Sequence, residues 1–251
     1  QVSAGHKKTM TPHTRAPGKL LANQHYLNKD YGSFKHLIQH FLAASTTTRP
    51  LTACFAVAGP VENNKVVFTN RSWTVDGAEI EADLGIRRVR LINDFVANGY
   101  GLLTLDTKTE CETLQAAPQV VGAPIACVGA GTGLGETFCT AAKADAPYEA
   151  YPSEGGHAEF VPRSELESEL AHFLMLKFGE KHRISVERVV SGPGIASVYE
   201  FYSTRFSAKA HPTVRASILT AGEMQARVIA NHAKRDARPF CAVCEMAMET
   251  F

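Results

Sequence analysis

The sequence predicts an α/β protein, and three observations carry that prediction. Short apolar runs of strand length alternate with segments whose apolar residues repeat at helical spacing. Capping-box patterns mark several expected helix starts. The 251 residues suffice for one large domain or two of ordinary size. Ligands of such proteins gather at the carboxyl ends of strands, so polar residues at those positions are candidates for function.

The first half of the chain predicts alternating strands and helices. Ser33 suits an N-cap, and the nearly all-apolar stretch Leu51–Ala58 is typical of a buried strand. Asp76 and Glu79 form a capping box whose helix ends at Gly85. In chain order, we expect a helix after Ser33, strands over 51–58 and 65–69, a helix from 76 to 85, a strand over 88–92 and a helix over 95–103.

The second half begins after a polar, uneven stretch at 106–118, which predicts a boundary between a small α/β lobe at 1–105 and a large α/β lobe at 106–251. We then expect strands over 124–128 and 136–141, a helix capped by Ser164 that ends near Gly179, a short helix after Ser185, a helix that starts at Ser191-Gly-Pro-Gly, and a helix opened by Thr220–Glu223.

Bulk composition argues against several classes of partner. Hydrophobic residues make up 45% and charged residues 20%, with 26 Lys and Arg against 25 Asp and Glu. A formal charge of +1 gives no overall field that would recruit nucleic acid or an anionic membrane. The sequence has no apolar run of membrane-spanning length. We therefore expect a soluble globular protein that acts on a small molecule.

The six cysteines do not form a secreted disulfide framework. Cys54, Cys127 and Cys139 lie in apolar runs and are expected to be small buried hydrophobes. Cys241 and Cys244 form one C-x-x-C pair without the further ligands that zinc needs, so we predict no metal-ligating residues. Free thiols favour a cytoplasmic location, with an organelle as the alternative because an unseen N-terminus could carry a signal.

The glycine-rich stretch Val128–Gly135 lies between two expected strands. A turn with so few Cβ atoms lets backbone N–H groups converge on an anion. It is neither a Rossmann loop nor a Walker loop, because it lacks their spacing and their helix. Gly131, Thr132 and Gly133 therefore predict a phosphate-binding turn on a β-hairpin, with an ordinary hairpin turn as the alternative.

Asn93 and Asp94 come where an expected strand ends and a helix begins. A carboxylate there could accept a proton from a substrate hydroxyl. The alternative is that Asp94 caps the following helix, and the two roles are compatible.

Three further positions could bind polar groups of a ligand. In Glu154-Gly-Gly-His157, the glycines would let a ligand approach, and the two side chains suit neighbouring sugar hydroxyls; the alternative is a glycine turn with two exposed polar residues. Glu187 could simply favour the positive end of a short helix capped by Ser185; alternatively, Arg188 pairs with a neighbouring acid. Asn70, after a strand, could hydrogen-bond a ligand, although a structural role is at least as consistent with its position.

Taken in order, the motifs A-G-P-V, T-N-x-x-W, L-I-N-D-F, G-A-G-T-G-L-G, E-G-G-H-x-x-F and E-R-V-x-S-G-P-G resemble those of glucokinases of the bacterial type. These enzymes belong to the hexokinase/actin-like ATPase superfamily. The resemblance covers about residues 19 to 205. It implies a two-lobed, RNase H-like architecture with the active site in the cleft between the lobes.

The resemblance also implies roles for individual residues. It implies ATP-dependent phosphorylation of the glucose 6-hydroxyl, with Asp94 as general base and with ATP and Mg²⁺ as cofactors. Gly131, Thr132 and Gly133 correspond to a segment that contacts ATP. The residues implied to hold the sugar's hydroxyls are Asn93, Glu154, His157 and Glu187. With Asn70 as the candidate named above and Asp94 as the base, they make up the expected substrate-binding set.

Two motifs of the family are missing from this sequence: the N-terminal D-x-G-G-T-N segment and the glycine-rich adenosine segment near the C-terminus. The absence of a starting methionine predicts a fragment of a longer protein, which would explain both losses. Two alternative functions stay open: a kinase of mannose or fructose, and a catalytically inactive sugar sensor. For the assembly, a homodimer stays open.

Overall fold

The computed structural model describes residues 2–4, 19–45, 50–68, 73–118, 120–144 and 146–251. The chain forms two compact units, which we call unit 1 (residues up to 127, with 137–152) and unit 2 (residues 128–136, with 153–251). Within the described ranges, no helix combines the length and apolar character needed to cross a membrane. The predicted lobes 1–105 and 106–251 concern the whole protein and stay a prediction.

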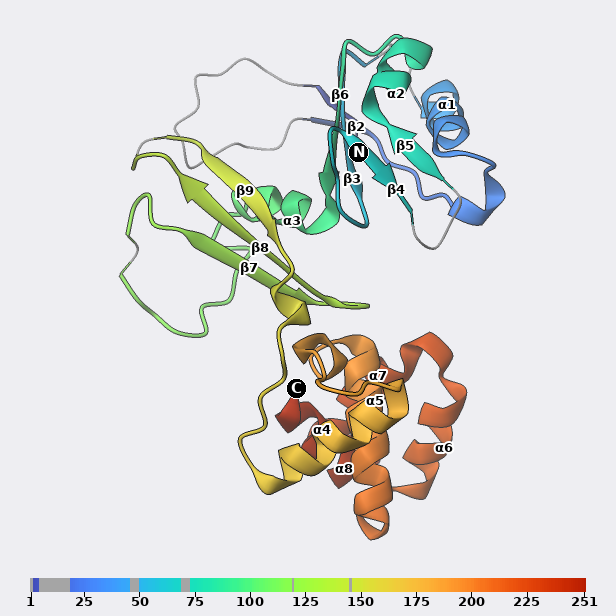
Figure 1. Ribbon diagram of the computed structural model, residues 1–251, viewed down its shortest axis with the longest axis vertical. Coiled ribbons are helices and arrows are strands. Elements are labelled where there is room, and N and C mark those ends of the chain that lie inside the picture. Colours follow the sequence, from blue (N-terminus) through green and yellow to red (C-terminus); the bar gives the residue numbers. More distant parts are fainter. Residues whose placement is uncertain (1, 5–18, 46–49, 69–72, 119, 145) are drawn as a thin grey trace. The chain divides into compact units, whose positions relative to one another are not determined.

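Unit 1 is a mixed α/β structure (Figure 1). A parallel pair, β3 (Thr52–Val57) and β6 (Arg88–Asn93), aligns Val57 with Asn93. The antiparallel pairs are β1 (Val2–Ala4) with β2 (Lys19–Ala22), and β4 (Lys65–Val67) with β5 (Thr74–Asp76). The helices are α1 (Phe34–Ser45), α2 (Gly77–Leu84) and α3 (Asp94–Leu102), and a short 3-10 helix covers Asn28–Asp30.

Local capping signals in unit 1 are confirmed. The Ser33 hydroxyl accepts a hydrogen bond from the His36 amide, and the Asp76 carboxylate accepts one from the Ala78 amide at 2.9 Å. That bond holds the pKa of the Asp76 carboxyl below its usual value. Helix α2 then ends at Gly85, which has a left-handed φ of 62°.

The prediction of a fully buried strand at 51–58 is wrong. Burial alternates along β3, so one face is covered and the other is exposed, and Leu51 is 65% exposed. Cys54 lies on the exposed face, which contradicts its predicted burial, whereas Cys139 is buried. The reason is that helices α1 and α2 pack on the face that carries Phe55 and Val57. Among the described residues, no core cluster includes Thr52, Cys54 or Ala56 on the other face.

A three-stranded sheet follows, in the order β7 (Ile125–Ala130), β8 (Leu134–Ala141) and β9 (Tyr148–Ser153). The sequence analysis missed β1, β2, β5 and β9. Helix α3 packs closely on this sheet at Gly99, where a Cβ would lie 2.8 Å from the Thr137 methyl and 3.3 Å from Ala150. This contact at Gly99 within unit 1 helps to fix the position of α3 on the sheet, and therefore the position of its first residue, Asp94.

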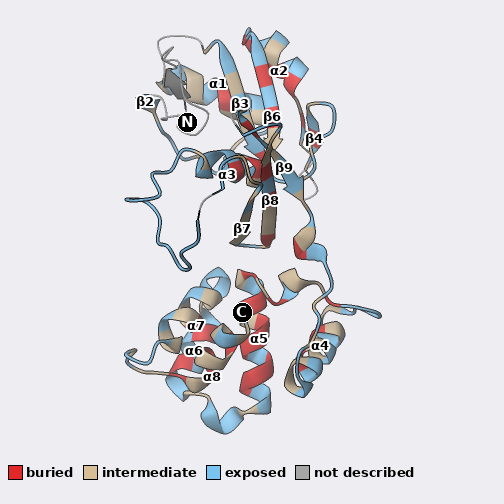
Figure 2. Ribbon diagram, turned by 90° about the vertical axis from the view of Figure 1, so that its left-hand side faces the viewer, coloured by how far each residue is buried: buried red, intermediate tan, exposed pale blue. Residues whose placement is uncertain are grey.

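Unit 2 is helical apart from the strand ends it includes (Figure 2). Helix α5 is its centre: Val198 is fully buried, and its neighbours Ile195, Tyr199 and Tyr202 are at most 7% exposed, as predicted. The helices are α4 (Glu165–Phe178), α5 (Gly192–Arg205), α6 (Pro212–Thr220), α7 (Gln225–Ala233) and α8 (Ala242–Thr250), with 3-10 turns at Gly155–His157, Val186–Arg188, Ser207–Lys209 and Gly222–Met224.

Three of the four expected helix starts in unit 2 are confirmed. The short helix after Ser185 is the 3-10 helix Val186–Arg188, although the Ser185 side chain makes no capping hydrogen bond. The Ser164 hydroxyl accepts a hydrogen bond from the Glu167 amide, and the Ser191 hydroxyl accepts one from the Gly194 amide. The capping box at Thr220 is wrong. The Thr220 hydroxyl instead donates back to carbonyls in the last turn of α6, so this residue ends one helix rather than starting the next.

Helix α4 offers a matched test of core packing. Leu170 is fully buried in the unit 2 core, whereas Leu176 on the same helix is 71% exposed. Leu170→Ala should lower the free energy of unfolding by about 2–5 kcal/mol, because it removes buried methyl groups and leaves a cavity. Leu176→Ala should change it by less than about 0.5 kcal/mol. Chemical denaturation of both variants checks this, and equal losses would contradict the assignment of the core.

Candidate functional site

The glycine-rich turn at 131–133 is closed by a hydrogen bond from the Gly131 amide to the Gly133 carbonyl at 2.8 Å. The Gly131 carbonyl in turn accepts a hydrogen bond from the amide of Gly192 at 2.8 Å. Gly192 is the first residue of α5, so the N-terminus of a 14-residue helix abuts the turn. The partial positive charge of a helix N-terminus favours an anion at this position.

Glu187 is the side chain that holds the far end of this turn. Its Oε2 accepts a hydrogen bond from the Leu134 amide at 2.9 Å, and 27% of the side chain is exposed. A Cβ on Gly133 would lie 2.3 Å from the same oxygen, so the contact requires glycine at position 133. The amides of Thr132 and Gly133 have no acceptor among the described residues, which leaves them available to a ligand.

Glu154 and His157 lie beside Glu187. Their closest approaches are 3.6 Å between His157 Nε2 and Glu154 Oε2, and 4.0 Å between His157 Nδ1 and Glu187 Oε1. The side chains of Glu154 and His157 are 78% and 60% exposed, so both can reach a ligand. The structure therefore brings the three predicted polar residues together with the turn inside unit 2.

The glycines at 155 and 156 do not leave space for a ligand, contrary to the expectation from the sequence. A Cβ on Gly155 would lie 1.9 Å from the Glu136 carboxylate, and one on Gly156 would lie 2.3 Å from the Leu134 carbonyl oxygen. The space is therefore filled by the chain itself. These glycines let the 154–157 turn pack against β8, which is how His157 comes close to Glu187.

Sequence reasoning missed Glu136 and Ser153 as supports of this turn. The Gly155 amide donates to the Ser153 hydroxyl at 3.1 Å, and that hydroxyl lies 3.5 Å from the Glu136 carboxylate. The only sequence signal was a carboxylate at the start of an expected strand that carries no other charge. The proposed pairing of Arg188 with an acid is also wrong, since its guanidinium lies 4.1 Å from the centre of the Phe178 ring.

Asn93 and Asp94 belong to unit 1, at the carboxyl end of β6. Asn93, rather than Asp94, caps α3: its Oδ1 accepts from the amides of Phe95 at 2.9 Å and Val96 at 3.3 Å. Asp94 is the exposed first residue of the helix, and its Oδ1 accepts only from the adjacent Phe95 amide. The capping alternative for Asp94 is therefore wrong, and its carboxylate faces solvent. Asn70 lies outside the described residues.

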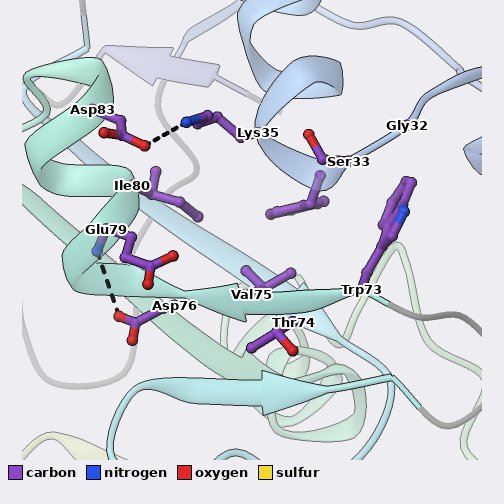
Figure 3. A pocket seen from close by; sticks show the side chains of 11 residues that line it. Gly32, Ser33, Lys35, Trp73, Thr74, Val75, Asp76, Glu79, Ile80 and Asp83 are labelled. Atoms are coloured by element: carbon purple, nitrogen blue, oxygen red, sulfur yellow. Dashed lines mark hydrogen bonds and ion pairs between the residues drawn. The ribbon is translucent and has the colours of Figure 1, made fainter.

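Unit 1 also contains a cavity of about 260 Å³ (Figure 3). It lies between the start of α1 and the β5–α2 segment, and an ion pair between Lys35 and Asp83 spans it at 2.6 Å. Trp73 forms one wall. None of the predicted site residues lines this cavity.

Within the ranges that the structure describes, no group of three or more His, Cys, Asp or Glu residues is arranged to hold a metal ion.

The cap at Asn93 can be tested separately from any activity. Asn93→Ala should destabilise the chain by about 1 kcal/mol, because the amides of Phe95 and Val96 lose their bonds to the capping oxygen. Asn93→Ser also loses the hydrogen bond from Asn93 Nδ2 to the Gly59 carbonyl, but it keeps a capping oxygen and should be less destabilised than Asn93→Ala. Thermal unfolding of the two variants checks this. Equal destabilisation by both would contradict the capping role.

Comparisons with known proteins identify the relatives of this chain. A family model described as Glucokinase matches residues 7–251. A glucokinase of Nostoc sp. is 41% identical over 225 residues, which cover 89% of this chain and 63% of the relative. The chain thus spans less than two thirds of the length of that curated relative.

Two solved structures are similar to the chain. A glucokinase from an Antarctic psychrotroph has a TM-score of 0.63 at 26% identity, over 87% of this chain and 62% of that one. A glucokinase of Balamuthia mandrillaris in complex with glucose has a TM-score of 0.56 at 20% identity, over 85% of this chain and 59% of that one. At that identity the second likeness concerns the fold alone.

Proposed function

The chain belongs to the glucokinase family, and from that premise we propose that the protein transfers the γ-phosphoryl group of ATP to the 6-hydroxyl of glucose. The products are glucose 6-phosphate and ADP. The observation that carries the proposal is the cluster of Glu154, His157 and Glu187 against the turn at 131–134. Such a cluster places hydroxyl-binding groups next to a turn with free amides.

Asp94 is the proposed general base. It stands at the carboxyl end of β6, and its exposed carboxylate is not used to cap α3, because Asn93 does that. As the 6-hydroxyl oxygen attacks the γ-phosphorus, its proton passes to Asp94 and the bond to the β-phosphate oxygen breaks, leaving ADP. Phosphoryl transfer depends mainly on alignment and on stabilisation of charge.

The sugar-binding residues proposed are Asn70, Asn93, Glu154, His157 and Glu187, together with Asp94 itself. Carboxylates accept hydrogen bonds from hydroxyls, and a neutral imidazole can both donate and accept. A sugar that lacks one partner would leave a polar group unpaired, at a cost of about 1–3 kcal/mol. This gives a physical basis for selectivity among hexoses.

Gly131, Thr132 and Gly133 are proposed to contact the phosphates of ATP. Support comes from the unused amides of Thr132 and Gly133 and from the N-terminus of α5 beside Gly131. Since the Leu134 amide already donates a hydrogen bond to Glu187, that amide is not available to a phosphate.

Mg²⁺ is the proposed partner of ATP, and it would neutralise phosphate charge. It commonly takes most of its ligands from water and phosphate. The described residues contain no three-ligand cluster, so we assign it no protein ligand and route no step through it.

For the whole protein we propose the two-lobed, actin-like ATPase architecture, with lobes at 1–105 and 106–251 and the substrates in the cleft between them. The mixed α/β content and the likeness to a solved glucokinase support it. A cytoplasmic location is proposed from the six free cysteines. A homodimer is proposed as the assembly, to be tested by light scattering.

The role of Asp94 leads to a direct test in the full-length protein. Asp94→Asn should lower kcat by about 100-fold or more, since a general base contributes about 10²–10⁴. A coupled assay for glucose 6-phosphate measures it. Asp236→Asn, at an exposed acid between α7 and α8, serves as the control and should leave kcat unchanged. A loss below about tenfold for Asp94→Asn would rule out the base role.

The hexose can be identified by a sugar panel. We expect kcat/KM for glucose to exceed the values for mannose and fructose by about tenfold or more, because a misplaced hydroxyl leaves a polar group of the site unpaired. Equal values for glucose and mannose would remove the assignment to glucose. Glucose binding without nucleotide binding, measured by calorimetry, would instead support the inactive sensor.

A further inference from the structure

The Glu187 carboxylate lies between the two halves of the candidate site in unit 2. Its Oε2 accepts from the Leu134 amide at 2.9 Å, and its Oε1 lies 4.0 Å from His157 Nδ1. We propose that Glu187 is a positioning residue that couples glucose binding to the shape of the nucleotide turn. The proposal rests on the function proposed above and deepens it.

The coupling follows from the rigidity of the carboxylate. Its two oxygens belong to one planar group, so a hydroxyl that binds Oε1 also restrains Oε2. At 27% exposure the side chain is partly shielded from water, which strengthens a hydrogen bond between a carboxylate and an amide. A sugar on the His157 side therefore steadies the acceptor that holds the Leu134 amide.

The same short segment of chain holds both ends of the turn. Glu187 binds the end at Leu134, and Gly192 donates to Gly131 at the other end. The Ser191 hydroxyl donates to the Glu187 carbonyl at 2.7 Å, which fixes the backbone between these two contacts. Any shift of Glu187 is therefore passed to the turn rather than absorbed by a loose loop.

The functional consequence is cooperative binding. A turn that is already ordered loses less conformational entropy when it binds phosphate, so glucose should tighten nucleotide binding, and nucleotide should tighten glucose binding equally. Through this coupling, the protein would bind ATP more tightly when glucose is bound than when the sugar site holds only water.

The chain offers variants that separate this role from sugar contact. Gly133→Ala removes no carboxylate from the site, but its Cβ would lie 2.3 Å from Glu187 Oε2 and so displace that oxygen from the Leu134 amide. Gly131→Ala, in the same turn, is the matched control, since its Cβ would have no neighbour within 4 Å. Glu187→Gln retains an oxygen that can accept from Leu134.

The first measurement is hydrogen exchange of the Leu134 amide in the full-length protein. Exchange should be faster in Gly133→Ala and Glu187→Ala, and near wild type in Gly131→Ala and Glu187→Gln. Unchanged exchange at the core residue Val198 shows that the variants are folded. Equal Leu134 exchange in the wild type and in folded Glu187→Ala would overturn the proposal.

The second measurement is the ratio of dissociation constants for a non-hydrolysable ATP analogue without and with saturating glucose, obtained by calorimetry. In the wild type we expect glucose to tighten binding about fivefold or more. The ratio should fall towards one in Gly133→Ala and Glu187→Ala. In Glu154→Ala it should persist at saturating glucose, because Glu154 contacts His157 but not the turn.

The outcomes separate the two proposals. A wild type that phosphorylates glucose but has a ratio of one, or an unchanged ratio in Gly133→Ala, overturns the coupling and leaves the glucokinase function standing. A full-length wild type that neither binds nor phosphorylates glucose overturns both.

Discussion

The hydrogen bond from the Leu134 amide to the Glu187 carboxylate is the contact on which the arrangement in unit 2 depends. A carboxylate acceptor makes the bond stronger than one between neutral groups, and partial burial limits competition from water. The bond determines which amides of the turn are left for a ligand. It also sets the position from which Glu187 faces His157, and so it relates the residues that we propose bind the sugar to the turn that we propose binds the nucleotide.

Close approach of the chain to itself is the second constraint, and glycine makes it possible. Gly133 admits the Glu187 carboxylate, and Gly155 admits the Glu136 carboxylate. Gly156 admits the Leu134 carbonyl, while in unit 1 Gly99 lets α3 rest on β8 and β9. At each position a Cβ would lie within 3.0 Å of another atom, so even alanine would force a rearrangement. The glycines of the site thus serve packing first, and their effect on a ligand is indirect.

The Asn93–Asp94 pair shows how neighbouring polar residues divide their roles. The amide side chain of Asn93 satisfies the first amides of α3 without adding charge. Asp94 is thereby left exposed at the start of the helix, and its carboxylate accepts a hydrogen bond only from the adjacent Phe95 amide among the described residues. A carboxylate in the first turn also interacts favourably with the helix dipole. Either residue type could cap a helix, so only the backbone geometry decides which one does.

The sequence by itself determined the α/β class, the family and the caps at Ser33, Asp76, Ser164 and Ser191, because a cap joins atoms only a few residues apart. Motif order also picked out the polar cluster and the glycine turn. The sequence could not predict the Glu187 contact with the turn, since its partners lie 53 residues apart. Nor could it predict the exposure of one face of β3, which depends on which helices pack against that face. The tertiary structure decided both, because contacts between distant residues and the burial of a strand depend on how the whole chain packs.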